Sequence, residues 1–326
     1  MVNLIVTLTI NPAIDRTITT DRLVFEDRTY ILDSTETAGG RGINASRVLH
    51  SFGASTLAVA TAGGDSGRRF ERHLQACGFP FELVPIASEI RTNLAITDRQ
   101  GLTIKLNELG PELQPAEVER VQAAVLRRLE GAEWLMLCGS LPPGVPETFY
   151  ASLIRLAHEH NVKTLLDTDG PALRTGIAAG PTVVAPNQQE AERLLETALV
   201  TRGHARRAAE RIRQMGAGCV VLSLGSRGAV GAFPDGIFEA VPPPVKAVCP
   251  IGAGDALAAA FVWAWGRGAD LVDALRWAVA AGTASATLPG VQFASLPEAR
   301  QIYDRLEVRR ISGPSPSGEA AGRSVR

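Results

Sequence analysis

Two glycines and a carboxylate precede a long apolar helical run in the stretch CPIGAGDAL at residues 249–257. A helix N-terminus presents unpaired backbone N–H groups and a partial positive charge, and Gly252 and Gly254 allow a bulky anion to approach them closely. Asp255 then lies in the first helical turn, beside any anion held there. An anion cradle with a built-in base is what phosphoryl transfer to a hydroxyl requires. Taken alone, the stretch fits a helix capped by Asp at least as well.

Six further segments have polar or glycine-rich sequences, and five of them follow strand-like runs. They are 11–15 (NPAID), 38–44 (AGGRGIN), 91–93 (RTN), 139–144 (GSLPPG), 186–190 (PNQQE) and 223–228 (SLGSRG). The carboxyl ends of parallel strands meet at one edge of a sheet, where α/β proteins bind their ligands. We therefore expect these segments to converge with 249–257 on one pocket.

Four side chains in these segments suit a phosphorylated or hydroxylated ligand. Arg41 and Asn44 offer hydrogen-bond donors beside three glycines, which favours such a ligand over an ordinary tight turn. Arg91 suits bidentate contacts to phosphate, and without further context a surface charge is equally compatible. Asp15 could accept hydrogen bonds from sugar hydroxyls, although by itself it fits a turn carboxylate better.

Two other segments suit a nucleotide and its metal ion. Asn187 and Glu190 are three residues apart on one face of a helix start, where their oxygens could position a hydrated Mg²⁺. The loop 223–228 ends a strand and carries glycines that allow close approach to phosphates. The loop 139–144 forms a rigid turn that is compatible with either a structural or a ligand-lining role.

The composition is typical of a soluble globular protein. Of 326 residues, 45% are hydrophobic and 21% charged, and 33 basic against 34 acidic residues lack the basic footprint of general nucleic-acid binding. The four cysteines form no C-x-x-C pair, which fits a reducing compartment. There is no signal-peptide pattern and no apolar run long enough to span a membrane, so we expect a cytoplasmic protein without a membrane partner.

Strand-like and helix-like segments alternate from about residue 110 onward. Apolar runs of strand length lie at 134–138, 164–166, 182–185 and 219–224, and helical patterns lie at 115–130, 146–160, 188–195, 205–215, 256–265 and 271–287. This alternation predicts the α/β class, with a parallel sheet that helices cover on both faces.

The N-terminal third has a different pattern. A buried strand is expected at 2–10 and a helix at 44–52, while 16–34 and 91–107 alternate like exposed β structure. Two such patches within an α/β domain suggest a small sheet above the main one, and an open sheet face is a natural lid or dimer surface. The tail after residue 311 is rich in Ser, Pro and Gly and is expected to be disordered.

Taken together, these motifs resemble those of the PfkB (ribokinase-like) carbohydrate kinases over residues 3–310. The resemblance rests on TLTINPAID (7–15), AGGRGIN (38–44), GSLPPG (139–144), PNQQE (186–190), SLGSRGA (223–229) and IGAGD (251–255). It implies a three-layer α/β/α kinase domain over 1–311 with a mostly parallel sheet, and a β-sheet lid from about 12–37 and 90–107. It also implies a homodimer formed through that lid, with residues 312–326 outside the domain.

The resemblance assigns roles to individual positions. Asp255 matches the catalytic base, and the backbone of Gly252, Ala253 and Gly254 matches an anion hole for the transferring phosphoryl group. The substrate-binding matches are Asp15, Gly39, Gly40, Arg41, Asn44 and Arg91, with Arg28 from the lid. The ATP-binding matches are Asn187, Ser223, Gly225 and Gly228. Glu190 and Asn187 match a motif that binds Mg²⁺, which we expect to be held through water.

Four positions depart from the pattern of the family. Ala185 stands where these kinases usually have Lys, which removes a positive charge near the nucleotide phosphates. Arg41 replaces the usual Lys of the glycine loop, Asp169 replaces a Ser, and Pro250 replaces the commoner Thr. Features of the 1-phosphofructokinase and tagatose-6-phosphate kinase branches are mixed in this chain, so the sequence does not settle the branch.

We therefore expect ATP-dependent phosphorylation of a ketohexose phosphate to a bisphosphate, with Arg41 and Arg91 selecting a substrate that already bears phosphate. The first choice is 1-phosphofructokinase, and the alternatives are tagatose-6-phosphate kinase and minor 6-phosphofructokinase. A weakly catalytic sugar-phosphate-binding protein is a rival that Ala185 and Pro250 motivate. A nucleotide-dependent dehydrogenase is a second rival, but Leu257 occupies the place of its third glycine.

Overall fold

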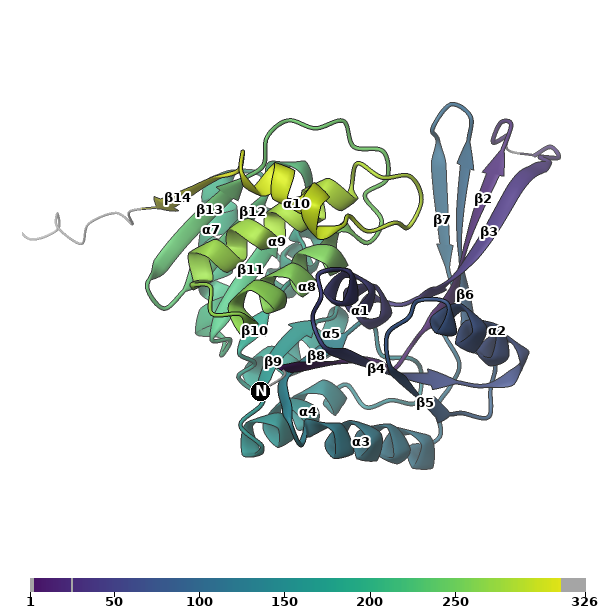
Figure 1. Cartoon of the computed structure of the whole chain (residues 1–326), viewed down its shortest axis with the longest axis horizontal. Coiled ribbons are helices and arrows are strands. Elements are labelled where there is room, and N and C mark those ends of the chain that lie inside the picture. The colour runs from purple at the N-terminus through teal and green to yellow at the C-terminus, as the bar shows by residue number, and fades with distance from the viewer. Residues whose placement is uncertain (1–2, 25, 312–326) are drawn as a thin grey trace, which may run out of the picture.

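The computed structural model describes residues 3–24 and 26–311, and its largest element is a ten-stranded sheet (Figure 1). The strand order is β14 (Glu307–Ile311), β13 (Gly236–Val241), β12 (Ala229–Phe233), β11 (Cys219–Ser223), β10 (Val183–Val184), β9 (Lys163–Asp167), β8 (Ala132–Cys138), β1 (Leu4–Thr9), β4 (Thr56–Ala62) and β5 (Phe81–Pro85). All pairings from β11 to β5 are parallel. The expected α/β architecture with a mostly parallel sheet is confirmed.

The antiparallel strands β12 to β14 were not expected from the sequence. Only two residues, Pro234 and Asp235, connect β12 to β13, whereas a parallel pair needs a crossover of a dozen or more residues. This hairpin therefore extends the parallel sheet with antiparallel strands, and β14 then pairs with β13.

Helices cover both faces of the large sheet. On β8, Trp134 and Met136 point to one face and Leu135 and Leu137 to the other. The first face packs against α1 (Arg41–Ser51), α8 (Ala253–Gly266), α9 (Leu271–Ser285) and α10 (Leu296–Tyr303). The second packs against α3 (Pro115–Leu129), α4 (Phe149–Glu159), α5 (Gly170–Ala178), α6 (Gln188–Leu195) and α7 (Arg202–Gln214), while α2 (Gly64–Gln75) contacts β4 and the small sheet. None of the described helices combines the length and apolar character needed to cross a bilayer.

Several helices begin earlier than their apolar pattern suggests, because polar residues and glycines form the first turn. The helix expected from residue 205 begins at Arg202, and Thr201 caps it by accepting a hydrogen bond from the His204 backbone N–H. The helix expected from 256 begins at Ala253, directly after Gly252. Sequence periodicity finds the buried turns of a helix and omits its exposed first turn.

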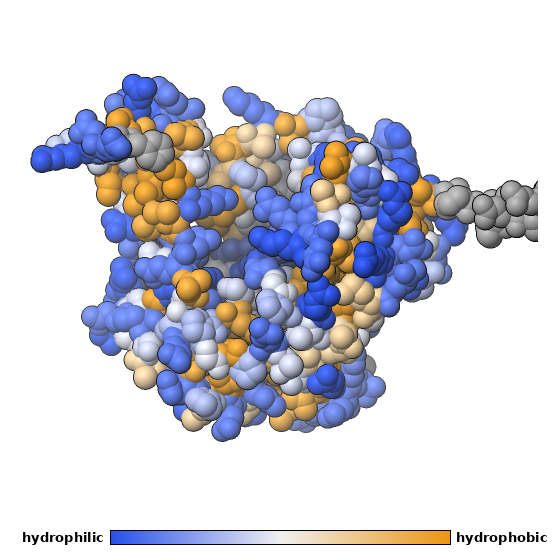
Figure 2. Space-filling view, turned by 180° about the vertical axis from the view of Figure 1, so that it is seen from behind, coloured by the Kyte–Doolittle hydropathy of each residue, from blue (hydrophilic) through white to orange (hydrophobic). Residues whose placement is uncertain are grey.

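A separate four-stranded sheet stands beyond the carboxyl edge of the large one (Figure 1). Its order is β3 (Ile31–Gly39), β2 (Ala13–Thr20), β6 (Arg91–Asp98) and β7 (Thr103–Asn107). In register, Asp15, Asn93 and Asn107 share the inner face, whereas the outer face carries Leu94, Ile96, Ile104 and Leu106. Figure 2 shows apolar side chains gathered on this sheet. The expected disordered tail, 312–326, lies outside the described residues.

Candidate active site

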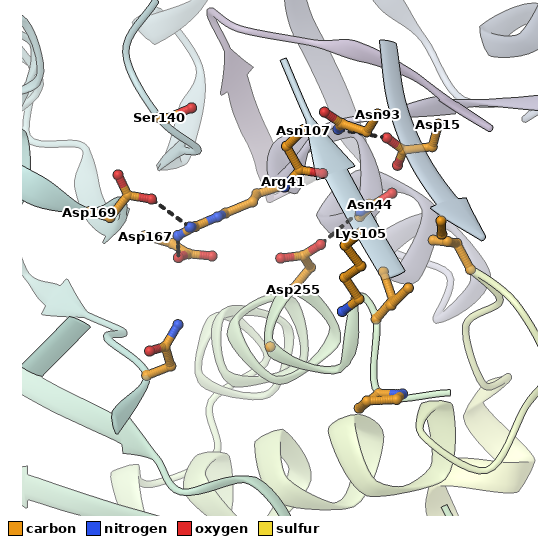
Figure 3. Close-up of a pocket in the computed structure, with 18 of the residues that line it drawn as sticks. Asp15, Arg41, Asn44, Asn93, Lys105, Asn107, Ser140, Asp167, Asp169 and Asp255 are labelled. Carbon is orange, nitrogen blue, oxygen red and sulfur yellow. Dashed lines mark hydrogen bonds and ion pairs between the residues drawn. The ribbon is translucent and has the colours of Figure 1, made fainter. Parts of the chain in front are cut away.

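A cavity of about 450 Å³ lies between the two sheets (Figure 3). We call its two sides the small-sheet wall, formed by Asp15, Arg91, Asn93, Lys105 and Asn107, and the large-sheet wall, formed by Asp167, Asp169, Asn187, Glu190 and Ser223. The N-termini of α1 and α8 meet between the walls and contribute Arg41, Asn44, Gly252, Gly254 and Asp255. Most of the expected segments therefore converge on one cavity.

The N-terminus of α8 opens directly into this cavity. Gly252 caps the helix in the left-handed conformation, with a φ of 80°, which glycine adopts without the steric penalty of a Cβ. At Gly254 a Cβ would meet no atom within 4 Å, so the backbone there borders open space. Asp255 follows in the first turn, and its Oδ2 accepts a hydrogen bond of 2.7 Å from Asn44 Nδ2. A helix N-terminus and a carboxylate thus face the same space.

Asp255 has the electrostatic environment of a proton acceptor. Burial, reinforced by the negative charge of Asp167, raises its pKa to about 7, while the Asn44 hydrogen bond and Arg41 oppose the rise. A carboxyl group with a pKa near 7 exchanges protons readily at neutral pH, as a general base must. Strongly shifted pKa values in a cleft are typical of functional sites.

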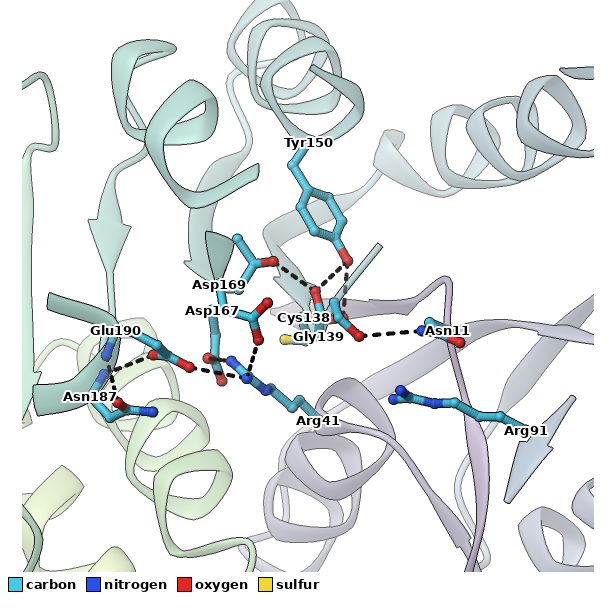
Figure 4. A network of polar contacts seen from close by, with 12 residues as sticks. Asn11, Arg41, Arg91, Cys138, Gly139, Tyr150, Asp167, Asp169, Asn187 and Glu190 are labelled. Atoms are coloured by element: carbon cyan, nitrogen blue, oxygen red, sulfur yellow. Dashed lines mark hydrogen bonds and ion pairs between the residues drawn. The ribbon is translucent and has the colours of Figure 1, made fainter. Parts of the chain in front are cut away.

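Arg41 reaches across the cavity floor to three carboxylates (Figure 4). Its Nη1 lies 2.8 Å from Asp167 Oδ1, and its Nη2 lies 2.8 Å from Asp169 Oδ2 and 3.0 Å from Glu190 Oε1. Although burial opposes it, the negative charge of these groups raises the pKa of Arg41. We expected Arg41 to act with Arg91 on a substrate phosphate, but its guanidinium points to the large-sheet wall and Arg91 lies apart from it (Figure 4).

The small-sheet wall presents a carboxylate, an amide and a guanidinium. Asp15 Oδ1 accepts a hydrogen bond of 2.9 Å from Asn93 Nδ2, and burial raises the pKa of Asp15. A Cβ at Gly39 would lie 2.2 Å from Asp15 Cγ, so only glycine lets the carboxylate lie against β3. Arg91 Nη1 donates to the Glu108 carbonyl, and burial lowers the pKa of Arg91 against the opposing charge of Asp15.

The large-sheet wall is held by a helix cap. Asn187 Oδ1 accepts from the Glu190 N–H and Glu190 Oε2 accepts from the Asn187 N–H, both at 2.9 Å, which fixes the first turn of α6. Ser223 ends β11 and pairs with Asn187 through an isolated β-bridge. Gly225 and Gly228 follow it, both with positive φ, in a loop that allows a ligand to approach the backbone closely.

The oxygen donors of this wall suit a hydrated cation better than a bare one. Among the described residues, no three acidic, His or Cys side chains are arranged to enclose a metal ion. Glu190 already accepts hydrogen bonds from Asn187 and an ion pair from Arg41. Mg²⁺ usually keeps several waters and binds through one or two carboxylates and substrate phosphates, and a single carboxylate that is already engaged in other contacts fits that mode.

Most expected site residues line the cavity, and those that do not are Arg28 and four residues next to or near lining ones, namely Gly39, Ala253, Gly225 and Gly228. Arg28 is exposed in the connection between β2 and β3 and does not line the cavity, so its contact with substrate stays a prediction. Lining residues that the sequence does not single out include Asn93 and Ser140, which lie within the expected segments 91–93 and 139–144, and Lys105, Asn107 and Asp167, which lie outside them. Their positions in the sequence indicate a place near the site, because each lies within an expected β patch or at the carboxyl end of an expected strand.

The chain is similar in sequence and in structure to several known proteins. A model for the pfkB family of carbohydrate kinases matches residues 3–299. A 1-phosphofructokinase of Rhodobacter capsulatus is 33% identical over 278 residues, covering 85% of this chain and 88% of the relative. An ATP-dependent 6-phosphofructokinase isozyme 2 of Escherichia coli (strain K12) is 32% identical over 305 residues, covering 93% and 98%. The tetrameric inhibited form of phosphofructokinase-2 from Escherichia coli has a TM-score of 0.86 at 31% identity, covering 94% of this chain and 99% of that one.

Proposed function

Because the chain belongs to the pfkB family of carbohydrate kinases and is a hexose-phosphate kinase, we propose fructose 1-phosphate as its acceptor and ATP as its phosphoryl donor. The observation that carries the proposal is Asp255, held by Asn44 at the N-terminus of α8 between two polar walls. The two kinds of phosphofructokinase among the relatives differ in where the substrate carries its phosphate. Fructose 6-phosphate and tagatose 6-phosphate are therefore the alternative acceptors.

In this mechanism the small-sheet wall binds the sugar phosphate. Arg91 contacts the phosphate group already present, and Asp15 accepts hydrogen bonds from sugar hydroxyls. These contacts place the free primary hydroxyl beside Asp255. Positioning of this kind supplies much of the rate enhancement in phosphoryl transfer.

The transfer step takes place between Asp255 and the N-terminus of α8. The hydroxyl oxygen forms a bond to the γ-phosphorus, the bond to the bridging oxygen of ADP breaks, and Asp255 takes the hydroxyl proton. The N–H groups around Gly252, Ala253 and Gly254 stabilise the charge on the transferring group. Asn187 and Glu190 would hold Mg²⁺ through water, and that ion neutralises phosphate charge.

A kinase assay with three acceptors tests this proposal. We expect the highest kcat/KM with fructose 1-phosphate, and a higher value with fructose 6-phosphate or tagatose 6-phosphate would move the assignment to that sugar. A preference for unphosphorylated fructose would overturn the role of Arg91. Tight binding of a sugar phosphate without release of ADP would favour the alternative of a weakly catalytic binding protein.

We also propose that two copies of the chain associate through the outer face of the small sheet. Leu94 and Ile96 of β6 lie opposite Leu106 and Ile104 of β7, and Leu106 is 53% exposed in the single chain. A contiguous apolar surface on a soluble protein is typical of an interaction site. Replacing Leu106 with Glu should give a monomer in sedimentation experiments, and an unchanged dimer would place the interface elsewhere.

A further inference from the structure

Arg41 carries the positive charge closest to the acidic side of the cavity. Asp167, Asp169 and Glu190 surround its guanidinium at 2.8 to 3.0 Å, and the Glu190 side chain is only 2% exposed. Arg91 and Lys105 also line the cavity, but among the described residues only Arg41 forms ion pairs with the large-sheet wall. Without it, three carboxylates would face a space that has to admit the phosphates of two substrates.

The geometry depends on a guanidinium and could not be reproduced by an ammonium group. Two different nitrogens of Arg41 contact three carboxylates that come from β9, the turn after it, and α6. A planar fork can satisfy partners in several directions at once, whereas Lys offers a single point charge. Arg41 therefore fixes these three segments relative to α1, whose next turn carries Asn44.

Asp167 links this cluster to Asp255. The charge of Asp167 favours the protonated form of Asp255, and Arg41 counteracts it both by pairing with Asp167 and by its own positive charge. The charged groups that face Asp255 are Arg41 of α1, Asp15 of β2, Lys105 of β7 and Asp167 of β9, and the uncharged groups are Asn44 and the buried Cys138 thiol of β8. Of the cations in residues 3–24 and 26–311, only Arg41 is paired directly with Asp167.

We propose that Arg41 is a positioning residue, which neutralises the carboxylates of the large-sheet wall and so keeps Asp255 available as the base, and that it does not bind the phosphate of the sugar. The proposal rests on the proposed kinase function. It changes the role that the sequence suggested, because two arginines were expected to select the phosphorylated sugar. Under this proposal, that task falls to Arg91 alone.

The pH dependence of kcat tests the proposal with three variants. In the wild type, activity should rise with pH through about 7 as Asp255 loses its proton. We call this rise in kcat with pH the limb of the profile. Loss of a nearby positive charge raises a carboxyl pKa, so Arg41→Met should move the midpoint of the limb to a pH higher by about one unit or more, and Arg41→Lys should move it by less. Asp169→Asn removes a negative charge and should move the limb downward. As a matched control, Arg69→Met removes an arginine that pairs with Glu36 outside the cavity and should leave the limb in place.

A second measurement separates the two possible roles of Arg41. A positioning role predicts that Arg41→Met changes the KM for the sugar phosphate by less than about threefold, whereas loss of a phosphate ligand raises it by about tenfold or more. An unchanged pH limb together with such a rise in KM would overturn the proposal. If Arg41→Met fails to fold, the opposite shifts expected for Arg41→Lys and Asp169→Asn still decide it.

A readout without turnover keeps the inference distinct from the proposed function. In protein labelled with ¹³C at aspartate carboxyl groups, Asp255→Asn identifies the Asp255 resonance. That resonance should titrate near pH 7 in the wild type and at higher pH in Arg41→Lys. If the protein shows this shift but phosphorylates none of the three sugars, the proposed function is wrong and the role of Arg41 stands. If the protein is fully active but the shift is absent, the role of Arg41 is wrong and the proposed function stands.

Discussion

The two walls of the cavity differ in how far the folded chain satisfies their polar groups. On the large-sheet wall, Asn187 and Glu190 bond to each other and Glu190 also pairs with Arg41. On the small-sheet wall, Asn93 Oδ1 and Arg91 Nε are buried without a hydrogen-bond partner among the described residues. Buried polar groups without partners are costly in a folded protein. The large-sheet wall is thus assembled by the fold itself, whereas the small-sheet wall has bonding capacity that a hydroxylated, phosphorylated ligand would use.

The difference follows from the way each wall is encoded. Asn187 and Glu190 are three residues apart and position each other within one helical turn. Asp15 and Asn93 are 78 residues apart and meet only because β2 pairs with β6. The cap formed by Asn187 and Glu190 can be rigid before any ligand binds. The pair of Asp15 and Asn93 depends on the pairing of β2 with β6 and on the position of the small sheet relative to the large one.

The largest effect should come from the residue at which the two walls meet. Asp255→Asn removes the proton acceptor but keeps the shape and the hydrogen bond with Asn44, so kcat should fall by about 10²- to 10⁴-fold. Steady-state kinetics at saturating substrates would show this. Activity near that of the wild type would mean that another group takes the proton.

The same variant should be more stable than the wild type at neutral and alkaline pH. Because the folded-state pKa of Asp255 is raised to about 7 from 3.8, the folded protein holds this proton more tightly than the unfolded chain. Its contribution to stability is present at low pH and is lost as pH rises through about 7. The amide introduced by Asp255→Asn carries no charge, so the excess in Tm over the wild type should grow between pH 5 and about 8. An equal Tm difference at all pH values would contradict the raised pKa.

The next largest effect should be confined to the small-sheet wall. Arg91→Met removes the cation that we assign to the sugar phosphate, and loss of a charge-assisted contact should raise the KM for the sugar phosphate by about 10²-fold. The KM for ATP should change little, because Arg91 does not touch the large-sheet wall. Equal increases in both constants would show that the two walls do not act separately.

The sequence predicts the large-sheet wall more fully than the small-sheet wall. The segments 186–190 and 223–228 could be located because each follows an apolar run, and a strand end followed by polar residues needs no long-range information. The sequence pattern omits Asp167 from the site because the predicted strand ends at residue 166, whereas β9 continues to Asp167. An error of one residue at a strand end removed a carboxylate from the site.

The direction of long side chains could not be predicted. The sequence predicts that Arg41 lines the ligand site, and Arg41 does line the cavity, but its partners Asp167, Asp169 and Glu190 are 126 or more residues away in sequence. Asn93 and Lys105 belong to expected β patches, yet their inward orientation depends on strand register, which a single-residue shift would reverse. Local pattern therefore identified the segments, and only the assembled sheets determined the contacts.

A smaller effect should separate the cap of the large-sheet wall from its role in binding. Asn187→Ala removes the side-chain cap of α6, which should cost about 1 kcal/mol of stability and, by loosening the first helical turn, raise the KM for ATP several-fold. Thr201→Ala is the matched control, because Thr201 caps α7 outside the cavity. Both variants should lose similar stability in denaturant titrations, and only Asn187→Ala should change the KM for ATP. If both Asn187→Ala and Thr201→Ala raised the KM for ATP, the effect would come from a general loss of stability and not from the cap at the cavity.

The smallest effect should come from adding the cation that the large-sheet wall lacks. Ala185 directly follows β10, and its N–H bonds to the Leu166 carbonyl, so it lies beside Asp167 on the neighbouring strand. In Ala185→Lys the new ammonium group can pair with Asp167 and approach the nucleotide phosphates, and an ion pair of this kind typically contributes about 1 kcal/mol or less. We therefore expect the KM for ATP to fall by about two- to fivefold, with the KM for the sugar phosphate unchanged. If the KM for the sugar phosphate changed instead, position 185 would influence binding at the small-sheet wall, and the two walls would not act separately.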